Sequence, residues 1–221
     1  MKRGFTLIEL MVSVAIFSVV MTLALGSLLS ISTAERKAET IRTAVSNLGF
    51  ALDSMTRSIR TGINYHCGTS GTVTQPQDCG YTGDTPYSTG QTYFAFQGVP
   101  GSIQGCVTGA TCTVEYQLVS TASGCGQTGT SVGCIKRRVT NTSSYDSGWL
   151  QITSPDVIIT GLTFYTIGSC ASNPPSGCNS GAADQIQPKV AITLSGYAQV
   201  SDTQQSAFNI QTSVTQRVFD Q

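Results

Sequence analysis

Charged residues make up only 11% of this 221-residue chain, less than half the share of about 25% that is usual in globular domains. Twelve basic and twelve acidic side chains leave a formal net charge of zero, which excludes both a basic field for nucleic acid and an acidic field for a cationic partner. Polarity comes instead from 23 Gly and from Ser, Thr, Asn and Gln, a composition typical of an exported β-rich domain with many turns.

An apolar segment at residues 5–31 directly follows a short basic leader. As a helix it spans about 40 Å, which is enough to cross a hydrocarbon core of about 30 Å. Lys2 and Arg3 precede the segment and the next basic residue is Arg36, so the positive-inside rule keeps the N-terminus in the cytoplasm and exports the rest. The apolar run is too long for an ordinary secretory signal, and no small-x-small cleavage site stands out at its far end. The simplest interpretation is a single-span membrane anchor.

Two features of this segment predict more than an anchor. Glu9 lies inside the apolar run, where a carboxylate costs roughly 3 kcal/mol and needs a partner. Because the run holds no Lys or Arg, we expect that partner to come from another molecule. Gly4 stands between the basic leader and the bulky Phe5. This arrangement predicts a protease cleavage site that precedes the apolar run.

Residues 2–12 (KRGFTLIELMV) resemble the class III leader of type IV prepilins and type II secretion pseudopilins. The resemblance implies that a prepilin peptidase cleaves between Gly4 and Phe5 and then methylates the new amine of Phe5. It also implies that Glu9 attracts the N-terminal amine of a neighbouring subunit during assembly. Major pilins usually carry a helix-kinking proline where this chain has Gly26; glycine weakens a helix by only about 1 kcal/mol relative to alanine, so a sharp kink is less expected here.

Beyond the span, apolar residues recur at spacings of three and four, which predicts a helix with one buried stripe. The stripe consists of Ile41, Val45, Leu48, Leu52, Met55 and Ile59. Asp53 and Arg57 are spaced for an i,i+4 ion pair, and Gly62 is a natural stop. We therefore expect one helix from about residue 6 to residue 61, with its first half in the membrane and its second half packed on a domain.

Short period-two apolar patterns follow a turn-rich stretch at 62–89. They predict six or seven strands in an antiparallel, meander-like sheet or pair of sheets. The expected fold class is α+β, with a long N-terminal helical spine packed on an antiparallel β-sheet domain that has disulfide-bracketed loops. The expected organisation is a cleaved leader at 1–4, a transmembrane and assembly half-helix at 5–31, an amphipathic half-helix at 32–61 and an exported β-rich domain at 62–221.

All eight cysteines follow residue 66, and they lie in polar, turn-rich sequence. An even number of cysteines in such loops predicts disulfides, which need an oxidising compartment. Of the 105 connectivities that eight cysteines allow, we favour pairing of neighbours, because each couple brackets one loop and a short loop costs little entropy to close. The expected pairs are Cys67–Cys79, Cys106–Cys112, Cys125–Cys134 and Cys170–Cys178.

The residues outside the leader show no recognised catalytic or metal-binding pattern, so we expect no enzyme, no cofactor and no metal site. The alternative is a calcium site built from loop carboxylates, although the acidic residues have no EF-hand spacing. The candidate carboxylates are Glu115, Asp156, Asp184 and Asp202. His66, the single histidine, has no nucleophile or zinc ligand at a recognised spacing and is expected to be a loop residue.

Two surface features remain. The basic run Lys136-Arg137-Arg138 lies on a predicted strand, so at most two of its side chains share a face. A solvated sheet surface is favoured over contact with DNA phosphates, and we find no convincing nucleic-acid site. Trp149 is expected to pack under the sheet, with an exposed anchor for adhesion as the alternative.

Stretches 154–165, 187–196 and 208–217 are similar to the last strands of W-type minor pilins and J-type pseudopilins, and the helix ending at 52–60 fits the same group. The resemblance implies a minor pilin that helps to initiate or cap filament assembly after cleavage and N-methylation. Its implied partners are other pilins, the prepilin peptidase/methyltransferase and the inner membrane, which holds a single-pass precursor before the pilus or pseudopilus forms. The alternatives are a pilus adhesin or DNA-uptake subunit with a surface ligand, and a type II secretion pseudopilin.

Overall fold

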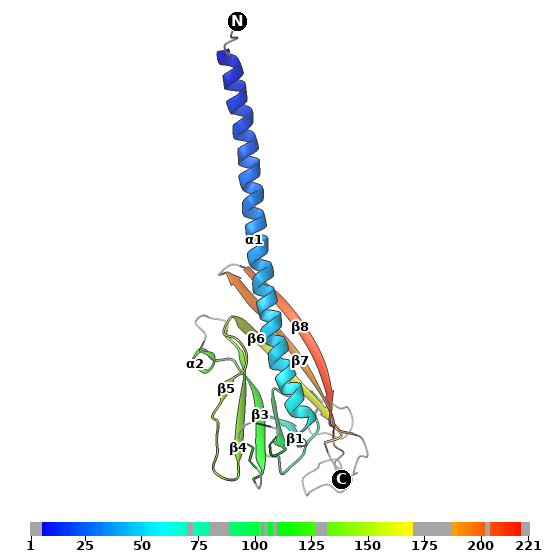
Figure 1. The fold of residues 1–221 in the computed structure, drawn as a ribbon. Helices are drawn as coiled ribbons and strands as arrows, with labels where there is room; N and C mark the ends of the chain where they lie inside the picture. Colours follow the sequence, from blue (N-terminus) through cyan, green and yellow to red (C-terminus); the bar gives the residue numbers. More distant parts are fainter. Residues whose placement is uncertain are drawn as a thin grey trace. The chain divides into compact units, whose positions relative to one another are not determined.

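The computed structural model describes residues 6–69, 73–79, 89–101, 103, 106–107, 110–126, 132–169, 187–201 and 204–217. The chain divides into two compact units, Met1–Arg42 and Thr43–Gln221. A single helix, α1, runs from Leu7 to Arg60 and belongs to both units (Figure 1).

The first unit contains the apolar part of α1. Its apolar side chains from Leu7 to Ile31 are exposed, and its most apolar 18-residue stretch has no buried residue. By length and composition this helix can therefore cross a membrane. The helix continues through Gly26, the position at which major pilins usually carry a proline.

In the second unit, α1 buries one stripe of side chains. The buried residues are Ala44, Leu48, Ala51, Leu52, Met55 and Ile59. The prediction that Val45 belongs to this stripe is wrong, because Val45 is 55% exposed. Successive residues of a helix are rotated by about 100°, so Ala44 faces the core and Val45 turns away from it.

The domain contains two antiparallel sheets, as expected. The first has the order β1-β2-β3-β4-β5 and the second the order β6-β7-β8, so both are meanders in which neighbours in sequence are neighbours in space. The first sheet comprises β1 (Ile63–Gly68), β2 (Tyr93–Gly98), β3 (Cys112–Val119), β4 (Cys134–Asn141) and β5 (Leu150–Gln151), with the short helix α2 (Ala122–Cys125) between β3 and β4. The second comprises β6 (Val157–Ile167), β7 (Lys189–Ser201) and β8 (Gln204–Thr215).

Strand β1 lies in a stretch that was predicted to consist of turns. It contains His66, so the prediction of a loop histidine is wrong: His66 is 3% exposed, and its Nδ1 lies 2.6 Å from the carbonyl oxygen of Gln75. The last four residues of β1 are all buried. Its sequence therefore does not alternate between apolar and polar side chains, as the sequence of a strand with one exposed face does. Pairing with β2, from Ile63 opposite Gln97 to Gly68 opposite Tyr93, makes this segment a strand.

One apolar core contains side chains from α1 and from both sheets. The ring of Phe94 in β2 stacks on that of Phe164 in β6, with centroids 5.1 Å apart. Tyr65 and Phe96 contact Phe94 at centroid distances of 5.7 and 5.8 Å. The hydroxyl of Tyr65 donates a hydrogen bond of 2.7 Å to the carbonyl oxygen of Ile59, which satisfies the buried phenol. This aromatic cluster joins the end of α1 to both sheets.

Gly62 follows the end of α1, as predicted, and its position also depends on close packing. A Cβ atom at this position would overlap the ring of Phe96, whereas a Cβ at Gly49, within the same helix, would meet nothing within 4 Å. We expect Gly62→Ala to lower the free energy of unfolding by about 1–3 kcal/mol, as overpacking does, and Gly49→Ala to leave it equal or raise it by up to about 1 kcal/mol. Chemical denaturation of the full chain in detergent micelles measures both. The close packing would be contradicted if Gly62→Ala lowered the free energy of unfolding no more than Gly49→Ala does.

Candidate functional site

The carboxylate of Glu9 lies in the first turn of α1, where it accepts a hydrogen bond from the side chain of the preceding Thr6. Thr6 precedes the helix, and its hydroxyl donates to Oε2 of Glu9 at 3.4 Å, while the amide of Leu10 donates to the carbonyl of Thr6 at 3.3 Å. A Thr followed three residues later by Glu is the capping-box spacing. The contact between Thr6 and Glu9 was not predicted from the sequence, although their spacing of three residues allows it.

The place of Glu9 in the first turn does not remove the need for a cationic partner. A carboxylate near a helix N-terminus gains about 0.3–1 kcal/mol from the helix dipole, while its burial in a membrane costs roughly 3 kcal/mol. Among the described residues, Glu9 has no ion pair. Gly4 and Phe5, the predicted cleavage and methylation residues, lie outside the described part of the chain.

Three other polar side chains of the apolar run are satisfied within the helix. Ser13, Ser18 and Thr22 each donate to a backbone carbonyl three or four residues earlier, at 2.7–3.0 Å. Glu9 faces a shallow hollow on the helix surface, which it shares with Ser13 and with apolar side chains such as Val12. Within residues 7–31, Glu9 is thus a charged group on an exposed apolar face, which is the kind of surface that other helices or lipid cover.

Three of the four expected disulfides are present in the structure. Cys67–Cys79, Cys106–Cys112 and Cys125–Cys134 have Cα–Cα distances of 5.7, 5.4 and 5.6 Å, within the range for such bonds. Cys170 and Cys178 lie outside the described residues, so their pairing remains a prediction.

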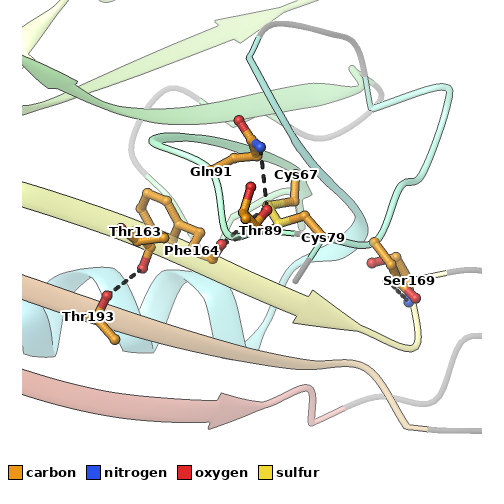
Figure 2. The surroundings of a disulfide bond; sticks show 9 residues. Cys67, Cys79, Thr89, Gln91, Thr163, Phe164, Ser169 and Thr193 are labelled. Atoms are coloured by element: carbon orange, nitrogen blue, oxygen red, sulfur yellow. Dashed lines mark hydrogen bonds between the residues drawn. A yellow bond between two sulfur atoms is a disulfide. The ribbon is translucent and has the colours of Figure 1, made fainter. Parts of the chain in front are cut away.

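The Cys67–Cys79 disulfide lies where the two sheets meet (Figure 2). Cys67 belongs to β1 of the first sheet, whereas Cys79 exchanges two backbone hydrogen bonds, of 2.9 and 3.1 Å, with Thr166 of β6 in the second sheet. Nearby, Gln91 and Phe164 exchange another pair, of 2.8 and 3.0 Å. The disulfide therefore fastens the segment that bridges the two sheets.

The basic run on β4 is divided between two faces, as expected from strand alternation. Arg137 stands opposite Tyr116, whose side chain is fully buried, whereas Arg138 pairs with Asp146 at 2.5 Å and with Glu115 at 3.8 Å. The guanidinium of Arg138 also lies 5.9 Å from the ring centroid of Trp149. Two carboxylates thus neutralise Arg138, which disfavours its use as a phosphate contact.

Trp149 packs against a small second core rather than standing free. It contacts the cluster of Val73, Tyr93 and Ala95, which agrees with the expected packing role. The hydroxyl of Tyr93 donates to Glu115 at 2.7 Å, and burial, together with this hydrogen bond, raises the pKa of Tyr93.

The ion pair of Asp146 and Arg138 predicts a specific acid dependence. Hydrogen bonds from Arg138 and from the amide of Gly148 lower the pKa of Asp146 from 3.8 to about 2. A lowered pKa in the folded state means that the contribution of Asp146 to stability is present above about pH 4 and is lost as the pH falls towards 2. We expect a carboxyl NMR titration of the full chain to give Asp146 a pKa near 2, and Arg138→Gln to move it back towards 3.8. Arg57→Gln, which removes the partner of Asp53, should leave Asp146 unchanged; an Asp146 pKa near 3.8 in the unmodified chain would contradict the pair.

A calcium site has no support in the described part of the chain. There, no group of three or more His, Cys, Asp or Glu side chains is placed to hold a metal ion. Glu115 is engaged by Tyr93 and Arg138, and Asp156 interacts with Ser154. Asp184 and Asp202 lie outside the described residues.

Comparison with known proteins identifies the N-terminal segment. Residues 1–25 match the family described as the prokaryotic N-terminal methylation motif, and the matched residues include Gly4, Phe5 and Glu9. No curated protein and no solved structure matches the chain. The motif and the apolar helix are consistent with a precursor anchored in the inner membrane. Together with the two antiparallel sheets and the three disulfides, they support assignment of the chain to the class of type IV pilins and pseudopilins.

Proposed function

We propose that this chain is a minor type IV pilin, a structural and non-catalytic subunit that helps to initiate or cap a pilus filament. In this proposal a prepilin peptidase removes residues 1–4 and methylates the new amine of Phe5. The observation that carries the proposal is Glu9, an anion on an exposed apolar helix that has no ion pair among the described residues. A neighbouring subunit whose chain begins at Phe5 supplies the cation.

The physical reason for assembly is the cost of two isolated charges in the membrane. A carboxylate and an ammonium group each lose their hydration there, and their mutual attraction grows as the effective dielectric falls. Removal of the leader creates an amine at the edge of the apolar run, and Glu9 lies one helical turn further in. Pairing of Glu9 with the amine of a different subunit neutralises both charges and sets the axial stagger between the helices.

The assignment to a minor subunit rests on two features. The helix has Gly26 in place of the proline that is usual in major pilins. The three stretches similar to minor pilins and J-type pseudopilins overlap β6, β7 and β8, which together form the second sheet. Deletion of the gene separates a pilus subunit, whose loss reduces piliation, from a secretion pseudopilin, whose loss reduces the export of secreted proteins.

N-terminal analysis of the membrane-extracted protein tests the processing step. Mass spectrometry should find a mature chain that begins at N-methylated Phe5. A Gly4→Val variant should keep its leader, because a β-branched side chain stands where the peptidase reads a small residue. Recovery of the unmodified chain with residues 1–4 attached would overturn the proposed processing.

A further inference from the structure

A groove of about 660 Å³ lies between the last turns of α1 and strand β8, both within the second unit of the chain. Its volume falls in the range of about 300–1,000 Å³ that is usual for ligand sites. Figure 1 shows the end of α1 and the C-terminal end of β8 side by side. Three arginines and one acidic residue line the groove: Arg57, Arg60, Arg217 and Asp53. Most of its remaining lining consists of the hydroxyl-bearing residues Thr56, Thr61, Thr212, Ser213 and Thr215.

The wall formed by β8 is an open sheet edge. Among the described strands, β8 pairs with β7 alone. The amide of Gln216 points towards the β7 side, where it donates to Pro188 at 2.9 Å, and the amide of Arg217 points the other way and donates to Arg60 at 2.9 Å. Alternate residues of an antiparallel strand direct their backbone groups to opposite sides. The N–H and C=O groups of Ser213 and Thr215 therefore point away from β7, towards the groove.

The groove carries an excess of positive charge. Asp53 pairs with Arg57 at 2.9 Å, but the side chains are 66% and 79% exposed, so this pair is weak and readily exchanged. Arg60 and Arg217 are exposed and have no ion pair among the described residues. Guanidinium groups bind carboxylates in a two-pronged geometry that favours them over other cations for this purpose.

We propose that this groove binds an extended acidic segment of a partner protein. The segment adds as a strand to the open edge of β8, and its carboxylates pair with Arg57, Arg60 and Arg217. An open edge offers alternating donors and acceptors, and a peptide backbone complements both. A polyphosphate or nucleic-acid backbone would match the arginines, but its phosphates have no donors for the carbonyl groups of Ser213 and Thr215. This interface lies on the exported domain and is separate from the proposed role of Glu9 in the membrane.

Fluorescence anisotropy on the full chain in detergent micelles tests the proposal with a labelled seven-residue peptide of alternating Thr and Glu. We expect this peptide to bind, and the double variant Arg60→Gln/Arg217→Gln to weaken its binding at least about tenfold, since it removes two charge-assisted contacts. The matched control, Arg36→Gln/Arg42→Gln, removes the same number of positive charges from a part of α1 outside the groove and should leave binding unchanged. The same peptide with Gln in place of Glu should bind weakly.

A peptide that is N-methylated at alternate residues tests the strand pairing without any change to the protein. It keeps the carboxylates but loses the backbone donors that face β8, so we expect it to bind at least about tenfold more weakly. Equal binding of the two peptides, or equal weakening by the two double variants, would overturn the proposal. Displacement of the peptide by polyphosphate at a lower concentration than by unlabelled peptide would also overturn it, in favour of a polyanion. If circular dichroism shows that the groove variant does not fold, the test is the binding of the N-methylated peptide to the unmodified chain, compared with the binding of the unmethylated peptide.

Discussion

Glu9→Gln is expected to leave the chain inserted in the membrane but to remove it from sheared filaments. Glutamine keeps the length of the side chain and an oxygen that accepts the hydrogen bond from Thr6, but it loses the charge that attracts the neighbouring amine. If the pairing offsets the cost of about 3 kcal/mol for a charge in the membrane, its loss lowers incorporation roughly a hundredfold. Quantitative immunoblots of the membrane and the sheared-filament fractions measure the two results separately.

Two controls separate the effect of charge pairing from the effect of the contact between Thr6 and Glu9. Thr6→Ala removes the hydroxyl that contacts Glu9 but keeps the carboxylate, so incorporation should stay near normal. Glu35→Gln removes a carboxylate from α1 outside the apolar run and should also have little effect. Normal incorporation of Glu9→Gln would contradict the assembly role. If Thr6→Ala lowered incorporation as much as Glu9→Gln does, the effect would belong to the contact between Thr6 and Glu9.

Removal of the Cys67–Cys79 disulfide by the double variant Cys67→Ala/Cys79→Ala should lower the free energy of unfolding by more than about 3 kcal/mol. The two cysteines are 12 residues apart, and release of a loop of this size costs about 3 kcal/mol through the entropy of the unfolded chain. Cys79 also exchanges backbone hydrogen bonds with Thr166 of the second sheet, so the loss should exceed that entropy. Denaturant titration of the full chain in micelles, with and without the disulfide, gives the value.

The Cys125–Cys134 disulfide offers a matched comparison. Its cysteines are 9 residues apart and are also buried, so the loop entropies of the two disulfides differ by only a few tenths of a kcal/mol. Cys125 is the last residue of the single-turn helix α2, and Cys134 is the first residue of β4, so this disulfide closes a connection within the first sheet. We expect Cys125→Ala/Cys134→Ala to cost less. Equal losses for the two double variants would contradict a special role of Cys67–Cys79 in fastening the sheets.

Several parts of the structure were predictable because their causes are local in sequence. A basic leader, an apolar run and a glycine before Phe5 identify the N-terminal segment without any tertiary contact. The buried stripe of α1 follows from helical periodicity, and Asp53 and Arg57 pair at 2.9 Å as their i,i+4 spacing predicts. Neighbouring cysteines pair in three of the expected couples because short loops close easily. The longer segments with a period-two apolar pattern form strands, and this pattern is also local in sequence.

Contacts between distant segments decided the rest. Strand β1 and the burial of His66 depend on pairing with β2, almost thirty residues further along the chain. The sheets on which α1 packs decide which face of the helix is buried. They cover Ala44 and leave Val45 exposed. The arginine groove joins the end of α1 to a strand more than 150 residues later, and the hydrogen bond from Gln216 to the carbonyl of Gly62 holds the two together.

The apolar span, the N-terminal methylation motif, the charge at Glu9 and the class of fold follow from local sequence, because each depends on a composition or a spacing within a few tens of residues. Long-range packing brings residues from the two ends of the β-rich domain's sequence together around a basic groove beside an open strand edge. The physical reason is that sequence periodicity states which face of an element is apolar, whereas the neighbour that covers this face, and the edge that stays open, follow from the packing of all the elements together.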